Sequence, residues 1–325
     1  MGDSTLMLLF PGQGSQYPGM GSDVFAEFPL ARDIYSRASD ALGYDVASLS
    51  FTDPDGQIGL TRFTQPCLLT HEIACLQVLE DLLGHPVQAR IAGGHSLGEY
   101  TALVAAGSLS LEDGLKLVKA RGELMSEFGE GGMVALTMDA DSAGGLAAQF
   151  FCQVATLNLP DQTVVAGKDN DLEKLVAYVG ENLPRKRAIP LATEGAFHTY
   201  LMVEAAQRFR AVLEDTRFEA PRFDVLSNFT GRVHDPHWGA IRTALFFQLF
   251  NPVNWVGCLA TALDSGVDTL VEFGGGLGKS EEPAGKRPNL EGIVKKTLSR
   301  SERDARSLAA LKVDSLRTSA AELAA

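Results

Sequence analysis

The chain has 325 residues, of which 45% are hydrophobic and 21% charged, and its formal net charge is −13. These values are typical of a globular protein with enough apolar side chains for one large domain, or for a domain with a second one inserted into it. The acidic balance excludes a general nucleic-acid-binding function, because neutralising phosphates requires clustered Lys and Arg. We therefore expect no nucleic acid among the partners.

Neither a membrane segment nor a metal site is predicted. The apolar stretches are interrupted by charge or glycine well before about 18 residues, and the N-terminus lacks the basic start and apolar core of a secretion signal. The cysteines show neither metal-ligand nor disulfide spacing: Cys67, Cys75, Cys152 and Cys258. We expect a cytoplasmic protein without membrane association or bound metal.

The first third of the chain predicts an alternation of strands and helices. An apolar run at 5–10 ends in the glycine-rich P-G-Q-G-S-Q, which is typical of a buried strand running into a loop. Apolar periodicity and turn residues then predict helices at 22–42 and 65–84, a strand at 90–92, and helices at 97–107 and 111–127.

The pattern changes after the glycine-rich stretch 129–132. Strands are predicted at 133–138, 152–157, 162–167 and 186–191, with helices at 141–149 and 170–180. This βαββαβ order is that of a ferredoxin-like unit. We expect residues 129–196 to form a small subdomain inserted into a larger one.

The larger subdomain is predicted to comprise residues 1–128 and 197–312. Its second part has predicted helices at 198–213, 239–250 and 253–265, a strand at 224–227 and a last buried strand at 269–273. Alternating strands and helices predict an α/β fold with a mostly parallel sheet covered on both faces. The Ala/Ser-rich residues 313–325 are expected to fray.

A serine occupies the turn between the strand at 90–92 and the next helix. Gly94-His95-Ser96-Leu97-Gly98 matches G-x-S-x-G, the nucleophile elbow, in which small residues permit a strained turn that exposes the serine hydroxyl. At the start of a helix, backbone N–H groups can stabilise an oxyanion, and Leu97 would supply the first. A plain strand-to-helix turn is the alternative reading.

A serine nucleophile needs a base, and His198 is the best placed of six histidines. His95 should point away from its neighbour Ser96, and the others occupy a predicted helix or polar turns: His71, His85, His234 and His237. His198 follows the predicted insertion, in G-A-F-H-T. Its position alone does not distinguish a base from a buried core histidine.

Together these residues resemble the malonyl-CoA:acyl carrier protein transacylase family, which includes discrete, trans-acting acyltransferases of polyketide synthesis. The resemblance spans roughly residues 5–300 and rests on ordered motifs: F-P-G-Q-G-S-Q (10–16), G-H-S-L-G-E-Y (94–100), R-G-E-L-M (121–125), G-A-F-H-T (195–199), Q-L-F-N-P-V-N-W (248–255) and V-E-F-G-G-G (271–276). It implies an α/β-hydrolase-like large subdomain beside the ferredoxin-like one.

The resemblance implies a role for each of several residues. Ser96 would be the nucleophile and His198 the general base and acid, with His198 oriented by a main-chain carbonyl near Gln248. Gln13 would supply a second oxyanion N–H. Arg121 matches the arginine that binds the substrate carboxylate, which suits its planar, bidentate donor group.

The implied reaction is a two-step malonyl transfer. An acyl-CoA thioester would acylate Ser96, and the phosphopantetheine thiol of an acyl carrier protein would then attack the ester, without any cofactor. Leu97 and Phe197 resemble malonyl-selecting variants, because a Phe before the histidine would crowd a 2-methyl branch. Fatty acid or polyketide synthesis would be the setting.

The sequence departs from the family at two places. Thr156 replaces the first asparagine of an A-N-x-N pattern, in which Asn158 is the second, so one polar contact of the substrate cleft is in doubt. The usual G-P-G-K turn is lengthened over 274–292, and we hypothesise that its Lys279, Lys286 and Arg287 bind the carrier protein.

Other functions remain open on the same scaffold. The chain could transfer a different acyl group, shuttle acyl groups between two carrier proteins, or hydrolyse acyl groups from a carrier protein; Arg121 disfavours the hydrolase, whose substrate would lack the carboxylate. A non-catalytic carrier-protein-binding module would not need Ser96, His198 and Gln13. An α/β-hydrolase esterase would not contain the inserted βαββαβ unit.

Overall fold

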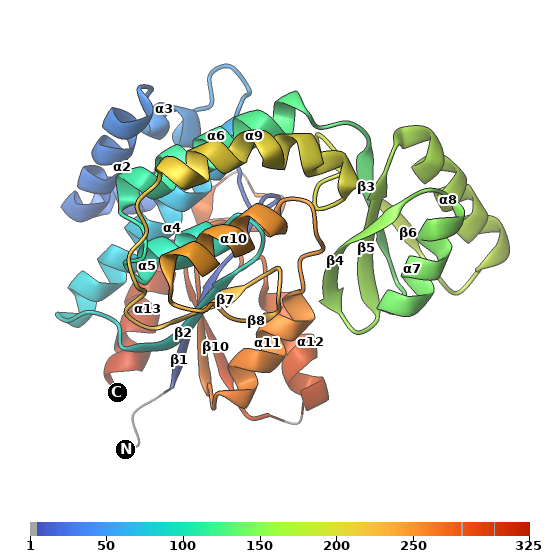
Figure 1. Ribbon diagram of the computed structural model, residues 1–325. Coiled ribbons are helices and arrows are strands. Elements are labelled where there is room, and N and C mark those ends of the chain that lie inside the picture. Colours follow the sequence, from blue (N-terminus) through green and yellow to red (C-terminus); the bar gives the residue numbers. More distant parts are fainter. Residues whose placement is uncertain (1–4, 281, 302) are drawn as a thin grey trace. The chain divides into compact units, whose positions relative to one another are not determined.

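The computed structural model describes residues 5–280, 282–301 and 303–325, which form two compact units (Figure 1). Unit 1 contains residues up to Gly122, Thr216–Leu226 and Ala262–Ala325, and unit 2 contains Glu123–Asp215 and Ser227–Thr261. The division therefore differs from the expected one. Residues 197–215 and 227–261, expected in the large subdomain, group with the small sheet.

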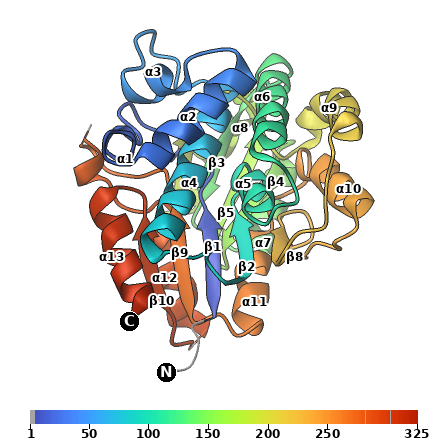
Figure 2. The ribbon, with the colours of Figure 1, turned by 90° about the vertical axis from the view of Figure 1, so that its left-hand side faces the viewer.

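Unit 1 is built on a parallel sheet with the strand order β10-β9-β1-β2-β7. The strands are β1 (Leu6–Phe10), β2 (Ala89–Gly94), β7 (Asp224–Ser227), β9 (Thr269–Phe273) and β10 (Arg306–Ala310). All five residues of β1 and of β9 are buried, as expected of parallel strands covered on both faces (Figure 2). This confirms the predicted α/β class.

The helices of unit 1 include those expected over 22–42, 65–84, 97–107 and 111–127, with shifted ends, and three that were not predicted, over 46–51, 291–301 and 313–324. They are α1 (Ser22–Glu27), α2 (Pro29–Leu42), α3 (Val46–Phe51), α4 (Thr61–Leu83), α5 (Gly98–Ala105), α6 (Leu111–Glu127, which ends in unit 2), α12 (Glu291–Ser301) and α13 (Val313–Ala324), with a 3₁₀ turn at Pro283–Gly285. The single helix expected over 22–42 is interrupted at Phe28, whose extended backbone (φ −110°, ψ 121°) precedes Pro29. A residue before proline disfavours helical backbone, which explains the break.

The expectation of a frayed tail is wrong. Residues 313–324 form α13, in which Leu316, Ser319 and Ala320 are buried and the Ser319 hydroxyl donates to the Ala309 carbonyl at 2.7 Å. The strand at 269–273 is likewise not the last, because β10 pairs with it. Small residues carry little hydrophobic signal, so the pattern of this region hid both elements.

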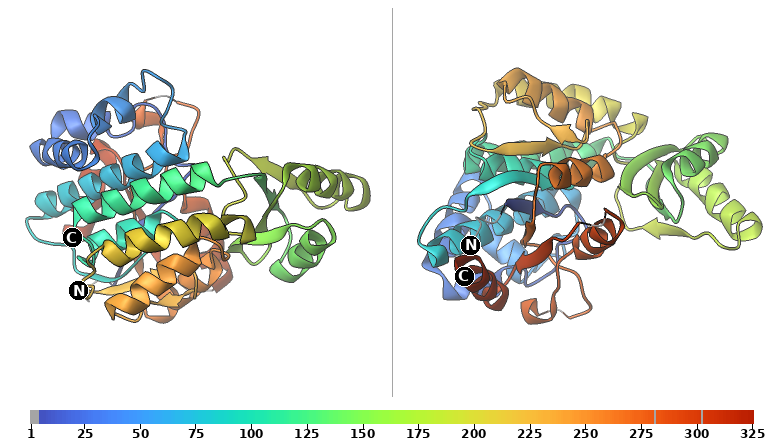
Figure 3. Two further views of the ribbon diagram at one scale, coloured as in Figure 1. Left: turned by 45° about the horizontal axis from the view of Figure 1, so that its top comes forward. Right: turned by 90° about the horizontal axis from the view of Figure 1, so that it is seen from below.

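Unit 2 contains a four-stranded antiparallel sheet with the order β4-β5-β3-β6. Its elements run in the predicted βαββαβ order, and the strand order is that of a ferredoxin-like fold: β3 (Gly132–Leu136), α7 (Ala140–Gln149), β4 (Gln153–Leu159), β5 (Gln162–Gly167), α8 (Asp169–Asn182) and β6 (Ala188–Leu191). α7 and α8 lie on the same face of this sheet (Figure 3).

The remaining part of unit 2 carries further helices and a two-residue strand. They are a 3₁₀ turn at Tyr200–Met202, α9 (Val203–Asp215), β8 (Arg232–Val233), α10 (Trp238–Gln248) and α11 (Trp255–Asp264, whose last residues belong to unit 1). Throughout the described part of the chain, every helix is too short or too polar to cross a bilayer.

Candidate active site

Ser96 lies in a strained turn between β2 and α5. Its φ of 53° is left-handed, a conformation that costs a non-glycine residue about 1–3 kcal/mol. The turn is fixed at both ends: the His95 N–H donates to the Phe10 carbonyl and the Gly98 N–H to the His95 carbonyl, each at 3.0 Å. This is the geometry expected of a nucleophile elbow, and it sets the serine at the carboxyl ends of β1 and β2.

Two glycines permit this turn because the backbone segments around it are in contact. A Cβ on Gly94 would overlap the Gly98 carbonyl, and a Cβ on Gly98 would overlap the Phe10 carbonyl. No flexible side chain is available to move aside at either position, since both obstacles are backbone. The sequence pattern G-x-S-x-G thus reflects close packing of the turn on the end of β1.

The glycine-rich loop, residues 11–17, follows β1 and lies against the serine turn. A Cβ on Gly12 would overlap the His95 carbonyl. Gln13 is held by its side chain, whose Nε2 donates to the Thr61 hydroxyl at 3.0 Å. Since Phe10 pairs with Gly94, the strand ends bring the backbones of Gln13 and Leu97 to the same edge of the sheet as Ser96.

Arg121 of α6 lies beside the serine hydroxyl. A guanidinium nitrogen donates to Ser96 Oγ at 3.1 Å, and the guanidinium carbon lies 5.3 Å from the centre of the Tyr100 ring. The side chain is only 1% exposed. Burial lowers the pKa of Arg121, opposed by Tyr100 and Glu99, but an arginine keeps its charge at any physiological pH.

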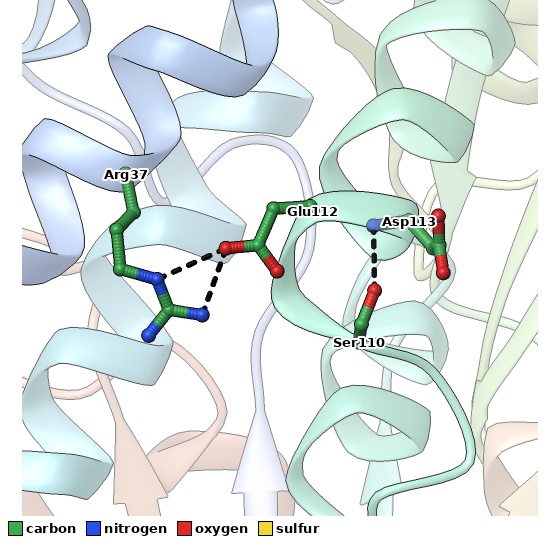
Figure 4. A network of polar contacts seen from close by, with 4 residues as sticks. All are labelled: Arg37, Ser110, Glu112 and Asp113. Atoms are coloured by element: carbon green, nitrogen blue, oxygen red, sulfur yellow. Dashed lines mark hydrogen bonds and ion pairs between the residues drawn. The ribbon is translucent and has the colours of Figure 1, made fainter.

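The helix that carries Arg121 is fixed at its start and beside Arg121 itself. Ser110 accepts from the Asp113 N–H at 3.0 Å, and Arg37 of α2 donates twice to Glu112, at 2.8 and 2.9 Å (Figure 4). A Cβ on Gly122 would lie 2.8 Å from the Thr61 carbonyl oxygen, so α6 meets the start of α4 backbone to backbone. A buried guanidinium on such a helix has little freedom to move.

His198 belongs to unit 2 and is also held in left-handed backbone, with a φ of 62°. Its ring Nδ1 lies 2.8 Å from the Gln248 carbonyl oxygen. A carbonyl can only accept, so Nδ1 carries the proton and, in the neutral ring, Nε2 is left as the acceptor. This is the tautomer that a general base requires.

The segment around His198 is anchored in the core of unit 2. The Ala196 N–H donates to the Glu130 carbonyl at 2.9 Å, and the Thr199 hydroxyl donates to the Ala196 carbonyl at 2.6 Å. Phe197 is 5% exposed and packs with Met202 in a buried cluster that includes Met133 and Val164 of the sheet. The imidazole therefore projects from a rigid support.

Asn158 and Thr156 both lie on β4. Asn158 is half-buried, and Thr156 is buried and forms an isolated bridge with Val253. Within the described residues, the Thr156 hydroxyl has no hydrogen-bond partner. The departure from the family's asparagine thus leaves a buried polar atom unsatisfied, which costs about 1–3 kcal/mol.

Two other side chains considered from the sequence, those of His71 and Lys286, are buried. His71 is fully buried, its Nε2 lies 3.2 Å from the Leu311 carbonyl oxygen, and burial lowers its pKa to about 4. Lys286 is 8% exposed, whereas Lys279 and Arg287 are exposed. The Lys286 ammonium donates to the Gly278 carbonyl within its own unit, so Lys279 and Arg287 are the exposed cations of the hypothesised carrier-protein site, which stays a hypothesis.

The structure groups the predicted residues into two sets. Unit 1 brings together Ser96, Leu97, Gln13 and Arg121, while unit 2 brings together His198, Phe197 and Gln248. Tyr100 and Thr61, which support Arg121 and Gln13, were missed, because no spacing rule links them to their partners. Among the described residues, no cluster of potential metal ligands occurs.

The acyl transferase domain family matches residues 7–272, most of the chain. The chain belongs to this family. This acyl transferase is 35% identical over 282 residues to a Staphylococcus aureus protein named malonyl CoA-acyl carrier protein transacylase. The match covers 84% of this chain and 89% of that one. It is 39% identical over 281 residues, 85% of its length, to the polyketide biosynthesis protein ThaF of Burkholderia thailandensis, but spans only 24% of that longer protein.

Solved structures agree with this assignment. The Clostridium perfringens malonyl CoA-acyl carrier protein transacylase matches with a TM-score of 0.86 and 33% identity, over 98% of this acyl transferase and 97% of that chain. A malonyl-transacylase in complex with its type II polyketide synthase acyl-carrier protein matches with a TM-score of 0.88 and 31% identity, over 98% and 100% of the two chains.

Replacing Gly98 by alanine tests the packing of the serine turn. We expect Gly98→Ala to lower the free energy of unfolding by about 1–3 kcal/mol or more, because its Cβ would overlap the Phe10 carbonyl. Gly292→Ala in α12 is the matched control, since nothing lies within 4 Å of its added Cβ. Denaturant unfolding measures both; equal stability of the two variants would contradict the packing argument.

Proposed function

We propose that this acyl transferase moves a malonyl group from coenzyme A to the phosphopantetheine thiol of an acyl carrier protein. The observation that carries the proposal is the 3.1 Å hydrogen bond between the buried Arg121 guanidinium and Ser96 Oγ at the strained turn. It places an anion-binding group beside a nucleophile, as a dicarboxylic acyl group requires. The names of the relatives, and the solved complex with a carrier protein, support the same substrate and partner.

The reaction proceeds in two halves with Ser96 as the acyl carrier. In the first, Ser96 Oγ bonds to the malonyl thioester carbon, its proton passes to His198 Nε2, and the carbon–sulfur bond breaks as that proton protonates the departing thiolate of coenzyme A. In the second, the carrier-protein thiol gives its proton to His198, its sulfur bonds to the ester carbon, and the carbon–oxygen bond breaks as Ser96 Oγ takes that proton. Ping-pong kinetics follow from this order.

His198 is proposed as the base on the strength of its tautomer. The Gln248 carbonyl fixes the proton on Nδ1, so that Nε2 is available to accept and return a proton. The same contact holds the ring orientation that an aspartate provides in a catalytic triad.

Charge on the tetrahedral intermediate is proposed to be stabilised by the backbone N–H groups of Gln13 and Leu97. Both follow strand ends that meet at the serine turn, and the loop of Gln13 is in contact with that turn. With these groups the chain itself supplies nucleophile, base and oxyanion donors, so the proposed reaction needs no cofactor beyond the thioester substrate. We propose the cytoplasm as its location.

Selectivity for malonyl is proposed to rest on Arg121. Its planar donor group can bind a carboxylate through two nitrogens, and the surrounding burial strengthens that interaction. Phe197 and Asn158 are proposed to bound the acyl site, with Phe197 acting from the core of unit 2.

Intact-mass spectrometry tests the nucleophile and the acyl group together. After mixing with malonyl-, methylmalonyl- and acetyl-CoA in separate reactions, we expect the wild type to gain the mass of a malonyl group. Ser96→Ala, which removes the acylated oxygen, should gain none. Ser108→Ala is the control, because that buried serine lies outside the serine turn and its hydroxyl donates to the Glu219 carbonyl; a malonyl adduct on Ser96→Ala would refute the assignment.

His198→Ala tests the base. We expect malonylation to slow by roughly 10²–10⁴-fold, because general-base catalysis contributes that much, while the adduct still forms at long times. Single-turnover quench-flow measures this rate. The exposed His237, which caps α10, provides His237→Ala as the control; wild-type rates for His198→Ala would exclude it as the base.

Arg121→Ala tests the carboxylate site. We expect Arg121→Ala to lower kcat/KM for malonyl-CoA because a buried charged contact is lost, and the loss of transition-state stabilisation should be about 2–5 kcal/mol. Loading from acetyl-CoA should be retained or rise. Arg317→Ala, at an exposed position in α13, is the control. Unchanged discrimination between malonyl- and acetyl-CoA would remove Arg121 from this role.

A further inference from the structure

The lengthened turn after β9 packs on the glycine-rich loop that carries Gln13. Its described residues, 274–280 and 282–290, are called the post-β9 segment below. The Gly276 N–H donates to the Ser15 carbonyl at 2.8 Å, and the Ser15 hydroxyl donates to the Gly12 carbonyl at 2.7 Å. A Cβ on Gly275 would lie 2.7 Å from Ser15 Oγ. The segment therefore touches the loop directly beside Gln13.

Lys286 connects the post-β9 segment to a buried tyrosine of the same loop. Its ammonium lies 4.1 Å from the centre of the Tyr17 ring and donates to the Gly278 carbonyl at 3.0 Å. Gly276 lies between the two side chains: a Cβ there would be 2.9 Å from Lys286 Cβ and 3.2 Å from Tyr17 Cε1. The lysine stem and the ring thus enclose the glycine that bonds to Ser15.

The environment makes this cation–ring contact a strong one. Tyr17 is 5% exposed and Lys286 is 8% exposed, so water screens little of their attraction. Burial, with smaller effects from Asp23 and Cys75, raises the pKa of Tyr17, which keeps the ring neutral. Among the described residues, the buried Tyr17 hydroxyl has no hydrogen-bond partner. The contact between Tyr17 and the Lys286 ammonium is made by the face of the ring.

The backbone around Lys286 is itself held by contacts with residues outside the loop. Leu277 and Arg287 exchange backbone hydrogen bonds of 2.8 and 3.0 Å, and Lys312 donates to the Lys286 carbonyl at 3.2 Å. The Glu272 carboxylate accepts from the Asn289 and Leu290 N–H groups at 2.6 and 2.9 Å. The backbone that carries the Lys286 side chain is therefore held by the β9 carboxylate and by Lys312 at the start of α13.

We propose that Lys286 is a positioning residue that holds the glycine-rich loop, and with it the Gln13 N–H, where the oxyanion forms. This inference rests on the proposed acyl transfer. An oxyanion donor acts on the transition state and not on the bound substrate, so its misplacement lowers kcat and leaves KM unchanged. The lysine acts through the loop and does not touch the reacting atoms.

Steady-state kinetics of Lys286→Met separate this role from carrier-protein binding. We expect kcat to fall about tenfold, a fraction of the 10²–10³ lost when an oxyanion donor is removed, with KM unchanged for malonyl-CoA and for the carrier protein. Lys286→Arg keeps a cation over the ring and should restore most of kcat. Lys116→Met, at an exposed position in α6, is the matched control. A raised carrier-protein KM at unchanged kcat would overturn the proposal.

Hydrogen exchange tests the loop without relying on activity. Peptides covering residues 11–17 should exchange faster in Lys286→Met than in the wild type or Lys116→Met, and equal exchange would overturn the proposal. If Lys286→Met does not fold, Tyr17→Leu removes the ring and should give the same loss of kcat; an unchanged kcat would count against it. A wild type that takes up no malonyl would refute the proposed function, while the exchange result would still decide the role of Lys286.

Discussion

The site of unit 1 depends on one close approach of backbone to backbone. The end of β1 meets the turn between β2 and α5 so closely that Gly94 and Gly98 have no room for a Cβ, and the chain between them takes left-handed backbone at Ser96. This constraint raises the hydroxyl at the sheet edge and gathers Leu97 and Gln13 around it. The hydrogen bond from Arg121 to Ser96 Oγ depends on this constraint, because the turn fixes the position of the accepting oxygen.

Much of this arrangement was predictable, because it follows from local sequence. The glycines of G-x-S-x-G predicted that Ser96 lies in a tight turn. The alternation of apolar residues over 133–191 predicted the βαββαβ order of the small sheet. The tail was mispredicted because α13 and β10 bury Ala and Ser, whose burial is decided by neighbours far along the chain. The contacts of Tyr100 with Arg121 and of Lys286 with Tyr17 were missed for the same reason, because each joins residues distant in sequence.

The proposed nucleophile and the proposed base are held in the same way on different supports. Ser96 and His198 both occupy left-handed backbone, each held by hydrogen bonds from the flanking residues. Such strain persists only where the surroundings over-determine it. In unit 1 the edge of the sheet holds the backbone of Ser96 in place. In unit 2 the buried cluster containing Phe197 and Met202 holds the backbone of His198. Precision at both side chains is thus obtained from backbone that could not relax without disturbing a core.

The neutral partner of His198 fits a substrate that brings its own charge. A carboxylate beside the imidazole would stabilise its protonated form and raise its pKa. The Gln248 carbonyl fixes the same tautomer without a net charge. In the proposed mechanism the permanent charge that binds the substrate anion is the cation of Arg121. The carbonyl thus gives the imidazole the orientation and the tautomer that a triad's aspartate would give it, without the rise in pKa that a carboxylate would cause.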